Sequence, residues 1–231
     1  MCGRYTLATA DFGGLRARFA LRASVEVRRR FNVAPGDDVL GVIRPADDAA
    51  QVEGTSLRWG LVPFWSQDPR EIAAKTINAR AETVAERPAY RDAFERRRCL
   101  IVADGFYEWC GGAAHWITLP RGEPFAFAGL WSSWRPRGAA REIEPLRSCA
   151  IVTTAAAGAV RALHDRMPVI LDPRDESAWM SPQTPTEELH ALMREPPAAA
   201  ALEYRAVSRA VNDARHDAPD CLDPPEQAAL F

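Results

Sequence analysis

Short runs of β-branched and aromatic residues, each bounded by turn-forming residues, recur along the chain and predict β-strands. The glycine-rich stretch 110–114 separates two of these runs and predicts a hairpin. Neighbouring strands should therefore pair locally and antiparallel. The predicted strands are residues 56–62, 99–109, 115–119, 124–131, 149–154, 169–171 and 203–208.

Helical patterns are short and lie between the strands. They cover residues 9–21, 81–98 with Pro88 starting a second piece, 156–163, 174–180 and 186–193. Regular alternation of strands and helices is absent, which favours an α+β fold: a mostly antiparallel sheet or open barrel-like core with short peripheral helices. No repeat or composition shift marks a boundary, so we predict a single domain over residues 1–231.

Composition narrows the class of protein. Hydrophobic residues make up 47% and charged residues 26% of the 231 residues, which excludes a disordered chain or a coiled coil. The formal net charge is −2, so any nucleic-acid contact must come from a local basic patch. The start lacks the pattern of a secretory signal, and no window approaches the ~18 apolar residues of a membrane span. We expect a cytoplasmic protein without membrane contact.

The five cysteines, at positions 2, 99, 110, 149 and 221, form an odd set without zinc-finger spacing. This argues against a disulfide framework and against a structural metal, and we expect no metal or other cofactor. Cys99 and Cys149 open apolar runs and should be small buried hydrophobic residues.

Cys2 differs because of its position. Removal of Met1 would leave a free α-amine beside the thiol, and such an amine has a pKa of about 7.7–8.0 against about 10.4 for lysine. An aldehyde would form an imine with this amine, and the thiol would close a thiazolidine ring. An N-terminal-nucleophile hydrolase, whose thiolate attacks an acyl carbon, is the alternative use. An incidental Met-Cys start is the third reading.

Six segments narrow these alternatives. In chain order they are MCGRYTL at the start, RFNVAPG (30–36), RWGLVPFW (58–65), INARAET (77–83), ADGFYEW (103–109) and LHDRMPVIL (163–171). Together they resemble the SRAP family, which includes bacterial SOS-response-associated proteins and a eukaryotic 5-hydroxymethylcytosine-binding protein. The similarity runs from Cys2 to about Pro219.

The resemblance implies a monomeric protein that binds single-stranded DNA and captures the ring-opened aldehyde of an abasic site as a covalent crosslink. Carried over by motif, Cys2 is the nucleophile and Asn78 holds the sugar or thiazolidine. Glu108 handles protons near the amine, and His164 acts as acid and base on the sugar hydroxyl. Weak strand-cleaving lyase activity and self-processing at Met1 are further expectations.

The residue types suit these tasks, yet each has a simpler alternative. An imidazole is suited to opening the sugar ring, but His164 also fits the end of a helix. Apolar neighbours would raise the pKa of Glu108, but an alternating strand would turn Glu108 to solvent. Asn78 alone would pass as a helix cap before Ala79.

A single strand of DNA needs cations for its phosphates and aromatic rings for its bases. The resemblance assigns phosphate contacts to Arg4, Arg80 and Arg166. It further assigns an aromatic wedge to Phe64 and Trp65, a loop beside the cysteine to Asn32 and Pro35, and a hydroxyl on the DNA path to Thr153. Position 64 departs from the family pattern, because it holds phenylalanine where a polar residue or a tryptophan is expected.

Two other functions compete with abasic-site capture. A cysteine peptidase or amidohydrolase is one, because Cys-Gly after Met1 also opens class II glutamine amidotransferases. A non-covalent single-stranded DNA-binding module with an incidental Cys2 is the other. For a non-covalent binding module, blocking the α-amine would leave DNA retention under denaturing conditions unchanged. For abasic-site capture, the same blocking would abolish that retention.

Overall fold

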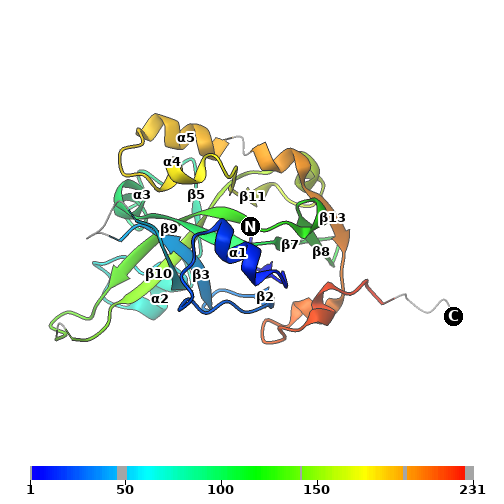
Figure 1. Cartoon of the computed structure of the whole chain (residues 1–231), viewed down its shortest axis with the longest axis horizontal. Coiled ribbons are helices and arrows are strands. Elements are labelled where there is room, and N and C mark those ends of the chain that lie inside the picture. The colour runs from blue at the N-terminus through cyan, green and yellow to red at the C-terminus, as the bar shows by residue number, and fades with distance from the viewer. Residues whose placement is uncertain (1, 46–50, 141, 195–196, 227–231) are drawn as a thin grey trace.

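The computed structural model describes residues 2–45, 51–140, 142–194 and 197–226, and within these ranges the strands form two sheets (Figure 1). The five strands of the smaller sheet pair antiparallel throughout. Their order is β13 (Glu203–Ala206), β8 (Ala113–Thr118), β7 (Gly105–Cys110), β1 (Tyr5–Leu7) and β2 (Arg30–Val33).

The larger sheet closes on itself. Its strand order contains β10 (Leu146–Ala155), β4 (Glu53–Trp59), β3 (Asp38–Ile43), β6 (Arg98–Ala103) and β9 (Phe125–Trp134). Because β10 pairs with both β4 and β9, these strands complete a ring. The short strands β5 (Asn78–Arg80) and β11 (Arg166–Pro168) pair with β10, and β12 (Ile170–Leu171) pairs with β9. The predicted α+β class with a mostly antiparallel, barrel-like core is confirmed.

The helices are short and peripheral, as predicted. They are α1 (Phe12–Arg18), α2 (Pro69–Ala73), α3 (Arg91–Arg96), α4 (Glu176–Met180) and α5 (Thr186–Arg194), with 3₁₀ turns η1 (Pro120–Gly122), η2 (Gly158–Ala162), η3 (Pro197–Ala201), η4 (Arg209–Asn212) and η5 (Pro219–Leu222). The predicted helix over residues 81–98 is wrong in its first half. Turns occupy residues 81–86, because the preceding strand β5 is held by β10 and the chain then bends away from it.

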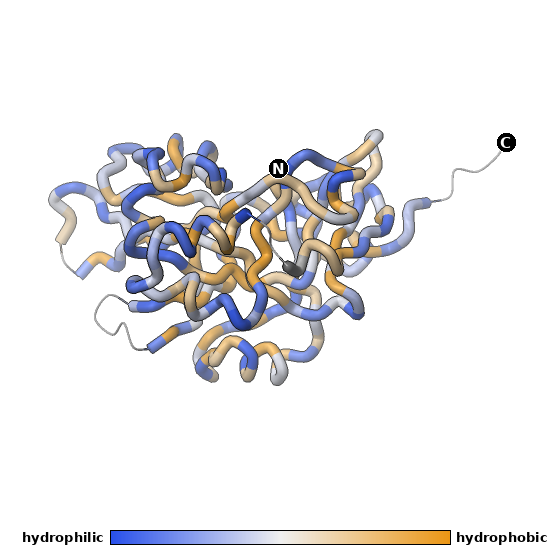
Figure 2. Tube along the Cα trace, turned by 90° about the horizontal axis from the view of Figure 1, so that it is seen from above, coloured by the Kyte–Doolittle hydropathy of each residue, from blue (hydrophilic) through white to orange (hydrophobic). Residues whose placement is uncertain are grey.

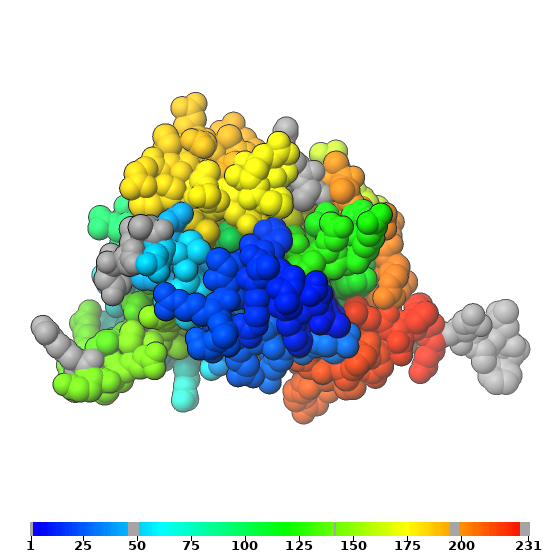
Figure 3. All heavy atoms as spheres, viewed as in Figure 1, coloured from blue at the N-terminus to red at the C-terminus, as the bar shows by residue number. Residues whose placement is uncertain are grey.

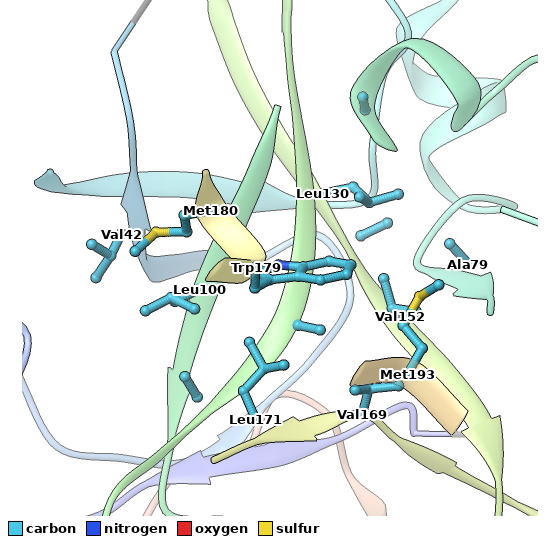
Figure 4. Packing of buried hydrophobic residues seen from close by; sticks show 14 of the residues in the cluster. Val42, Ala79, Leu100, Leu130, Val152, Val169, Leu171, Trp179, Met180 and Met193 are labelled. Carbon is cyan, nitrogen blue, oxygen red and sulfur yellow. The ribbon is translucent and has the colours of Figure 1, made fainter. Parts of the chain in front are cut away.

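Helices α4 and α5 cover one side of the ring (Figure 1). Trp179 of α4 is fully buried, and its indole nitrogen donates a 3.0 Å hydrogen bond to the carbonyl of Cys99 on β6. Figure 4 shows its ring among the labelled side chains of Leu100, Leu130 and Leu171. Apolar segments gather in the interior of the molecule and polar segments follow its periphery (Figure 2).

The predicted strand over residues 99–109 is two strands, β6 in the ring and β7 in the smaller sheet. Asp104 lies between them, and its carboxylate accepts hydrogen bonds from the Thr6 hydroxyl and the N–H groups of Ala8 and Thr9, all at 2.6 Å. Three donors compensate for the burial of this carboxylate. The turn at Asp104 therefore brings β7 beside β1, three residues after Cys2.

Residues 209–222 pack against the beginning of the chain, as Figure 3 shows by the contact of its red and blue regions. Asp217 accepts the N–H groups of Phe31 and Asn32 and pairs with Arg30. The Asn32 amide in turn donates to the carbonyls of Asp213 (2.9 Å) and His216 (2.7 Å). These contacts fasten the C-terminal segment to strand β2.

No helix in the described ranges combines the length and the apolar composition that crossing a membrane requires.

Candidate active site

Cys2 lies in a buried cluster that both sheets build, together with Tyr5, Phe106 and Phe127. The side chain has no exposed surface, and its Sγ is 3.7 Å from the carbonyl of Arg4, to which the thiol donates. Burial, and secondly the carboxylate of Glu108, raise the pKa of the Cys2 thiol far above its usual value. The sulfur is therefore a protonated thiol at neutral pH.

Asn78 holds the backbone of Cys2. It begins β5, where its neighbour Ala79 pairs in parallel with Val152 on β10, so the helix-cap alternative is wrong. Its Nδ2 donates a 2.8 Å hydrogen bond to the carbonyl of Cys2. Its Oδ1 is buried without a hydrogen-bond partner among the described residues. One end of the amide thus fixes residue 2, and the other end is available to a ligand.

Glu108 is buried, with 3% of its surface exposed, so the solvent-facing alternative is wrong. It shares a face of β7 with Phe106, which belongs to the same cluster as Cys2. Burial raises the pKa of Glu108, and the positive charge of the N-terminal amine and, after it, that of His164 oppose this shift. A carboxyl group with a raised pKa beside Cys2 is suited to general acid–base chemistry.

His164 is placed by the chain that runs from η2 to β11. Its N–H donates to the carbonyl of Val160, and the carbonyl of Asp165 accepts from Ala156. The His164 Nδ1 accepts the N–H of Arg166 at 2.9 Å and lies 2.7 Å from the Asp165 carboxylate. The first contact requires an Nδ1 without a proton and the second an Nδ1–H, so Nδ1 has a partner both as an acceptor and as a donor.

Cys2, Asn78, Glu108 and His164 are thus brought together from four separate parts of the chain. Asn78 reaches Cys2 through a hydrogen bond, and Glu108 interacts electrostatically with both Cys2 and His164. A thiol, an amide, a carboxyl group and an imidazole related in this way are the kinds of group that can carry out addition to a carbonyl and loss of water.

The residues assigned to DNA divide into exposed and internal ones. Phe64 and Trp65 are 55% and 43% exposed, and Arg80 and Pro35 also face solvent. Thr153, by contrast, is fully buried.

Two of the arginines that are predicted to contact phosphates form hydrogen bonds with other groups of the protein. Arg4 donates to Oδ1 of Asn32 and to the carbonyl of Val211, both at 2.8 Å. Arg166 forms a bidentate pair with Glu82, at 2.5 and 3.0 Å, and donates to the Thr153 carbonyl at 2.7 Å. Contacts of these arginines with DNA stay predictions. To bind a phosphate, each arginine would have to give up its protein partners or bind them and the phosphate together.

The model of the SOS response associated peptidase (SRAP) family matches residues 1–214. The chain belongs to this family. The abasic site processing protein YoqW of Bacillus subtilis is 35% identical over 232 residues, which cover 96% of this chain and 99% of YoqW. The abasic site processing protein HMCES of Gallus gallus is 33% identical, over 74% of this chain and 57% of HMCES.

Solved structures give the same fold. A protein from Bacteroides thetaiotaomicron has a TM-score of 0.82 at 22% identity, over 97% of this chain and 99% of that one. A protein from Bordetella bronchiseptica has a TM-score of 0.74 at 26% identity, over 90% of this chain and 100% of that one. These structures show the fold, and the family model together with the relatives confirms the family resemblance of the six segments.

Sequence reasoning missed two residues that support this SRAP site. Tyr90 donates a 2.9 Å hydrogen bond from its hydroxyl to the carbonyl of Asn78, and Glu82 pairs with Arg166. Both lie in the segment predicted as helical, residues 81–98 with Pro88 starting a second piece, where no local pattern signals such contacts. Trp109, at the end of the same strand as Glu108, is 36% exposed, and its indole nitrogen donates a 2.8 Å hydrogen bond to Oδ1 of Asn212.

One group in the described part of the chain combines metal-ligand types: His216, Asp220 and Cys221, whose ligand atoms lie within 4.8 Å of one another. The His216 Nε2 and Asp220 Oδ1 atoms are 2.7 Å apart, and the Cys221 thiol donates to the His216 carbonyl at 3.6 Å. These contacts are ordinary for a surface ion pair beside a buried thiol, and we assign no metal to them.

Proposed function

We propose that this protein processes abasic sites by capturing them in single-stranded DNA, as a covalent crosslink to Cys2 after removal of Met1. The hydrogen bond from Asn78 to the Cys2 carbonyl carries the proposal, because it fixes the residue whose amine must react. Membership of the SRAP family and the names of the relatives support the lesion class.

The proposed reaction begins at the amine. The neutral α-amine of Cys2 adds to the aldehyde carbon of the opened sugar, and loss of one water gives an imine. The Cys2 sulfur then adds to the imine carbon while its proton moves to the nitrogen, which closes a thiazolidine ring. The sum is aldehyde plus aminothiol giving thiazolidine plus water, without any redox step.

Each site residue has a task in this sequence. Glu108 accepts a proton from the ammonium group and returns one to the departing hydroxyl, which its raised pKa favours. His164, whose Nδ1 lies near both a hydrogen-bond donor and an acceptor, moves the proton that opens the closed sugar. The Oδ1 of Asn78 accepts a hydrogen bond from the sugar or from the new ring nitrogen.

The exposed residues supply the DNA contacts in this proposal. Phe64 and Trp65 are adjacent and exposed, so both can stack on bases. Arg80 follows Asn78 on β5 and faces solvent, where it can meet a phosphate next to the captured sugar. The imine also permits β-elimination of the 3′ phosphate, so a weak lyase activity accompanies capture.

A specific observation weighs against a thiolate-first hydrolase. With Met1 in place, burial and Glu108 raise the pKa of the Cys2 thiol more than the N-terminal charge lowers it, whereas cysteine nucleophiles of hydrolases work through a lowered pKa. An amine-first reaction requires no thiolate at the outset. We therefore favour capture over peptidase or amidohydrolase activity, and restrict peptidase activity to self-processing at Met1. A cytoplasmic, monomeric protein that needs no cofactor completes the proposal.

Retention of DNA on a denaturing gel tests the proposal. The protein is incubated with a single-stranded oligonucleotide that carries one abasic site, and then again after selective blocking of its α-amine. The unblocked protein should retain the DNA and the blocked one should not. A Cys2→Ser variant is compared as well, and its matched control is Cys110→Ser, which changes an exposed cysteine. The control should behave as wild type. Equal retention by blocked protein would refute covalent capture by the amine.

Cys2→Ser adds a finer test. A serine amine still forms the imine, but its hydroxyl is a poorer group for ring closure than a thiol. The variant should therefore retain DNA only when borohydride reduces the imine. Retention without reductant, at the wild-type level, would contradict the thiazolidine step.

A further inference from the structure

His115 lies directly opposite Glu108 in the antiparallel pair of β7 and β8. Residues directly opposite each other project from the same face of a sheet, with Cβ atoms about 4.5–5.5 Å apart. Phe106 and Ile117 form the corresponding pair two residues along, and both belong to the buried cluster that contains Cys2. His115 therefore shares the sheet face of the candidate active site.

The imidazole is held in place but incompletely bonded. Its Nδ1 is buried and has no hydrogen-bond partner in the described part of the chain. Its ring packs edge-to-face on Tyr204 of β13, with the centroids 5.6 Å apart and an interplanar angle of 80°. Tyr204 is 42% exposed at the edge of the sheet. Packing on one side thus orients a ring whose buried nitrogen is available.

We propose that His115 is a positioning residue for Glu108, with its Nδ1–H donating a hydrogen bond to the ionised carboxylate during capture. The inference rests on the proposed function, in which Glu108 takes and returns a proton. A hydrogen bond donated to a buried carboxylate favours its ionised form, which is the form that accepts a proton from the amine. The other groups that act electrostatically on Glu108 are the N-terminal amine, which also donates a hydrogen bond to it, then His164, Asp165 and Cys2.

Two substitutions separate the nitrogen from the ring. His115→Phe keeps an aromatic ring against Tyr204 and removes the donor. His115→Asn places an amide at the position of Nδ1 and restores a donor. Tyr204→Phe is the matched control, because it keeps the packing on His115 and changes only an exposed hydroxyl. Thermal unfolding shows whether each variant is folded. If His115→Phe does not fold, His115→Gln replaces it, because the longer glutamine side chain carries its amide beyond the position of Nδ1.

The measurement is the single-turnover rate of crosslinking from pH 5 to pH 9. With His115→Phe, the acidic limb of the pH–rate profile should move to higher pH, and the rate at pH 6 should fall about threefold to tenfold. His115→Asn and Tyr204→Phe should keep the wild-type profile. The inference would be overturned if the pH–rate profile of His115→Phe superimposed on that of wild type. It would also be overturned if the profile of His115→Asn were displaced as far as that of His115→Phe.

A second readout separates this inference from the proposed function. If wild-type protein crosslinks at no pH, the proposed function fails. The inference is then decided by carbon NMR titration of the Glu108 carboxyl group in wild type and His115→Phe. A higher pKa of Glu108 in the variant supports the positioning role, and an equal pKa refutes it.

Discussion

Replacing Glu108 with glutamine distinguishes amine-first from thiolate-first chemistry. Glutamine fills nearly the same volume at a position that is 3% exposed, so it leaves no cavity. It removes the proton acceptor, and it removes the carboxylate that helps to raise the pKa of the Cys2 thiol. The two consequences act on the rate in opposite directions.

If the amine attacks first and Glu108 is its base, crosslinking should slow by about 10²–10⁴-fold, the usual contribution of a general acid–base group. If a thiolate attacks first, the variant should react faster, because its thiol ionises more readily. The assay is single-turnover crosslinking of an abasic oligonucleotide, with Glu176→Gln as control. Glu176 is a buried carboxylate on α4 that pairs with Arg18. A rate for Glu108→Gln equal to or above that of wild type would refute our account.

The same variant carries a prediction for stability. Because the pKa of Glu108 is raised in the folded state, the folded protein binds more protons than the unfolded chain at pH values between the two pKa values. The contribution of Glu108 to the free energy of unfolding therefore falls as pH rises between these two pKa values. Glu108→Gln should not lower the free energy of unfolding at pH 7.5, and any advantage over wild type should shrink as pH falls toward 5. Urea unfolding at both pH values measures this, and a marked loss of stability in the variant at pH 7.5 would contradict it.

Three further predictions follow from particular contacts. Asn78→Ala removes the hydrogen bond to the Cys2 carbonyl and should slow crosslinking about tenfold, whereas an unchanged rate would exclude the positioning role. Arg98→Met leaves the carbonyls of Phe94, Glu95, Trp179 and Ser181 without their buried donor, and should lower the free energy of unfolding by about 3 kcal/mol in urea. Trp65→Ala should weaken equilibrium binding to unmodified single-stranded DNA by about 5- to 150-fold, while Ile143→Ala, which changes another exposed apolar residue, should not.

Local patterns predicted the elements that local sequence stabilises. The hairpin between β7 and β8 turns at Gly111 and Gly112, whose φ angles are +59° and +79°, and such angles favour glycine at both positions. Cys99 and Cys149 are fully buried within apolar strands, as their neighbours indicate. These features depend on residues that are adjacent in the chain.

Elements stabilised by distant partners were not predictable in this way. Strand β5 has only three residues and exists because it pairs with β10, some 70 residues later. Arg98 closes the charged run 95–98, a pattern typical of a solvated surface, yet it is buried because the ends of α3 and α4 meet around its guanidinium. Alternation alone could not decide which face of β7 is covered. The face that carries Phe106 and Glu108 packs into the cluster around Cys2, and Glu108 is buried there.

The four candidate site residues came from motif resemblance, and the structure supplies their physical relations. The motif could not indicate that Arg4 and Asn32 turn toward the C-terminal segment, because their partners lie about 180 to 207 residues away. Nor could it identify Glu82 as the partner of Arg166. Such contacts arise only when the chain has folded.

The most direct measurement is the intact mass of the purified protein, alone and after incubation with a single-stranded oligonucleotide that carries one abasic site. Our account predicts a free protein lighter by one methionine, and an adduct whose mass is the sum of protein and DNA less one water. Cys2→Ala should abolish the adduct. A protein that retains Met1 and forms no adduct would contradict covalent capture through Cys2.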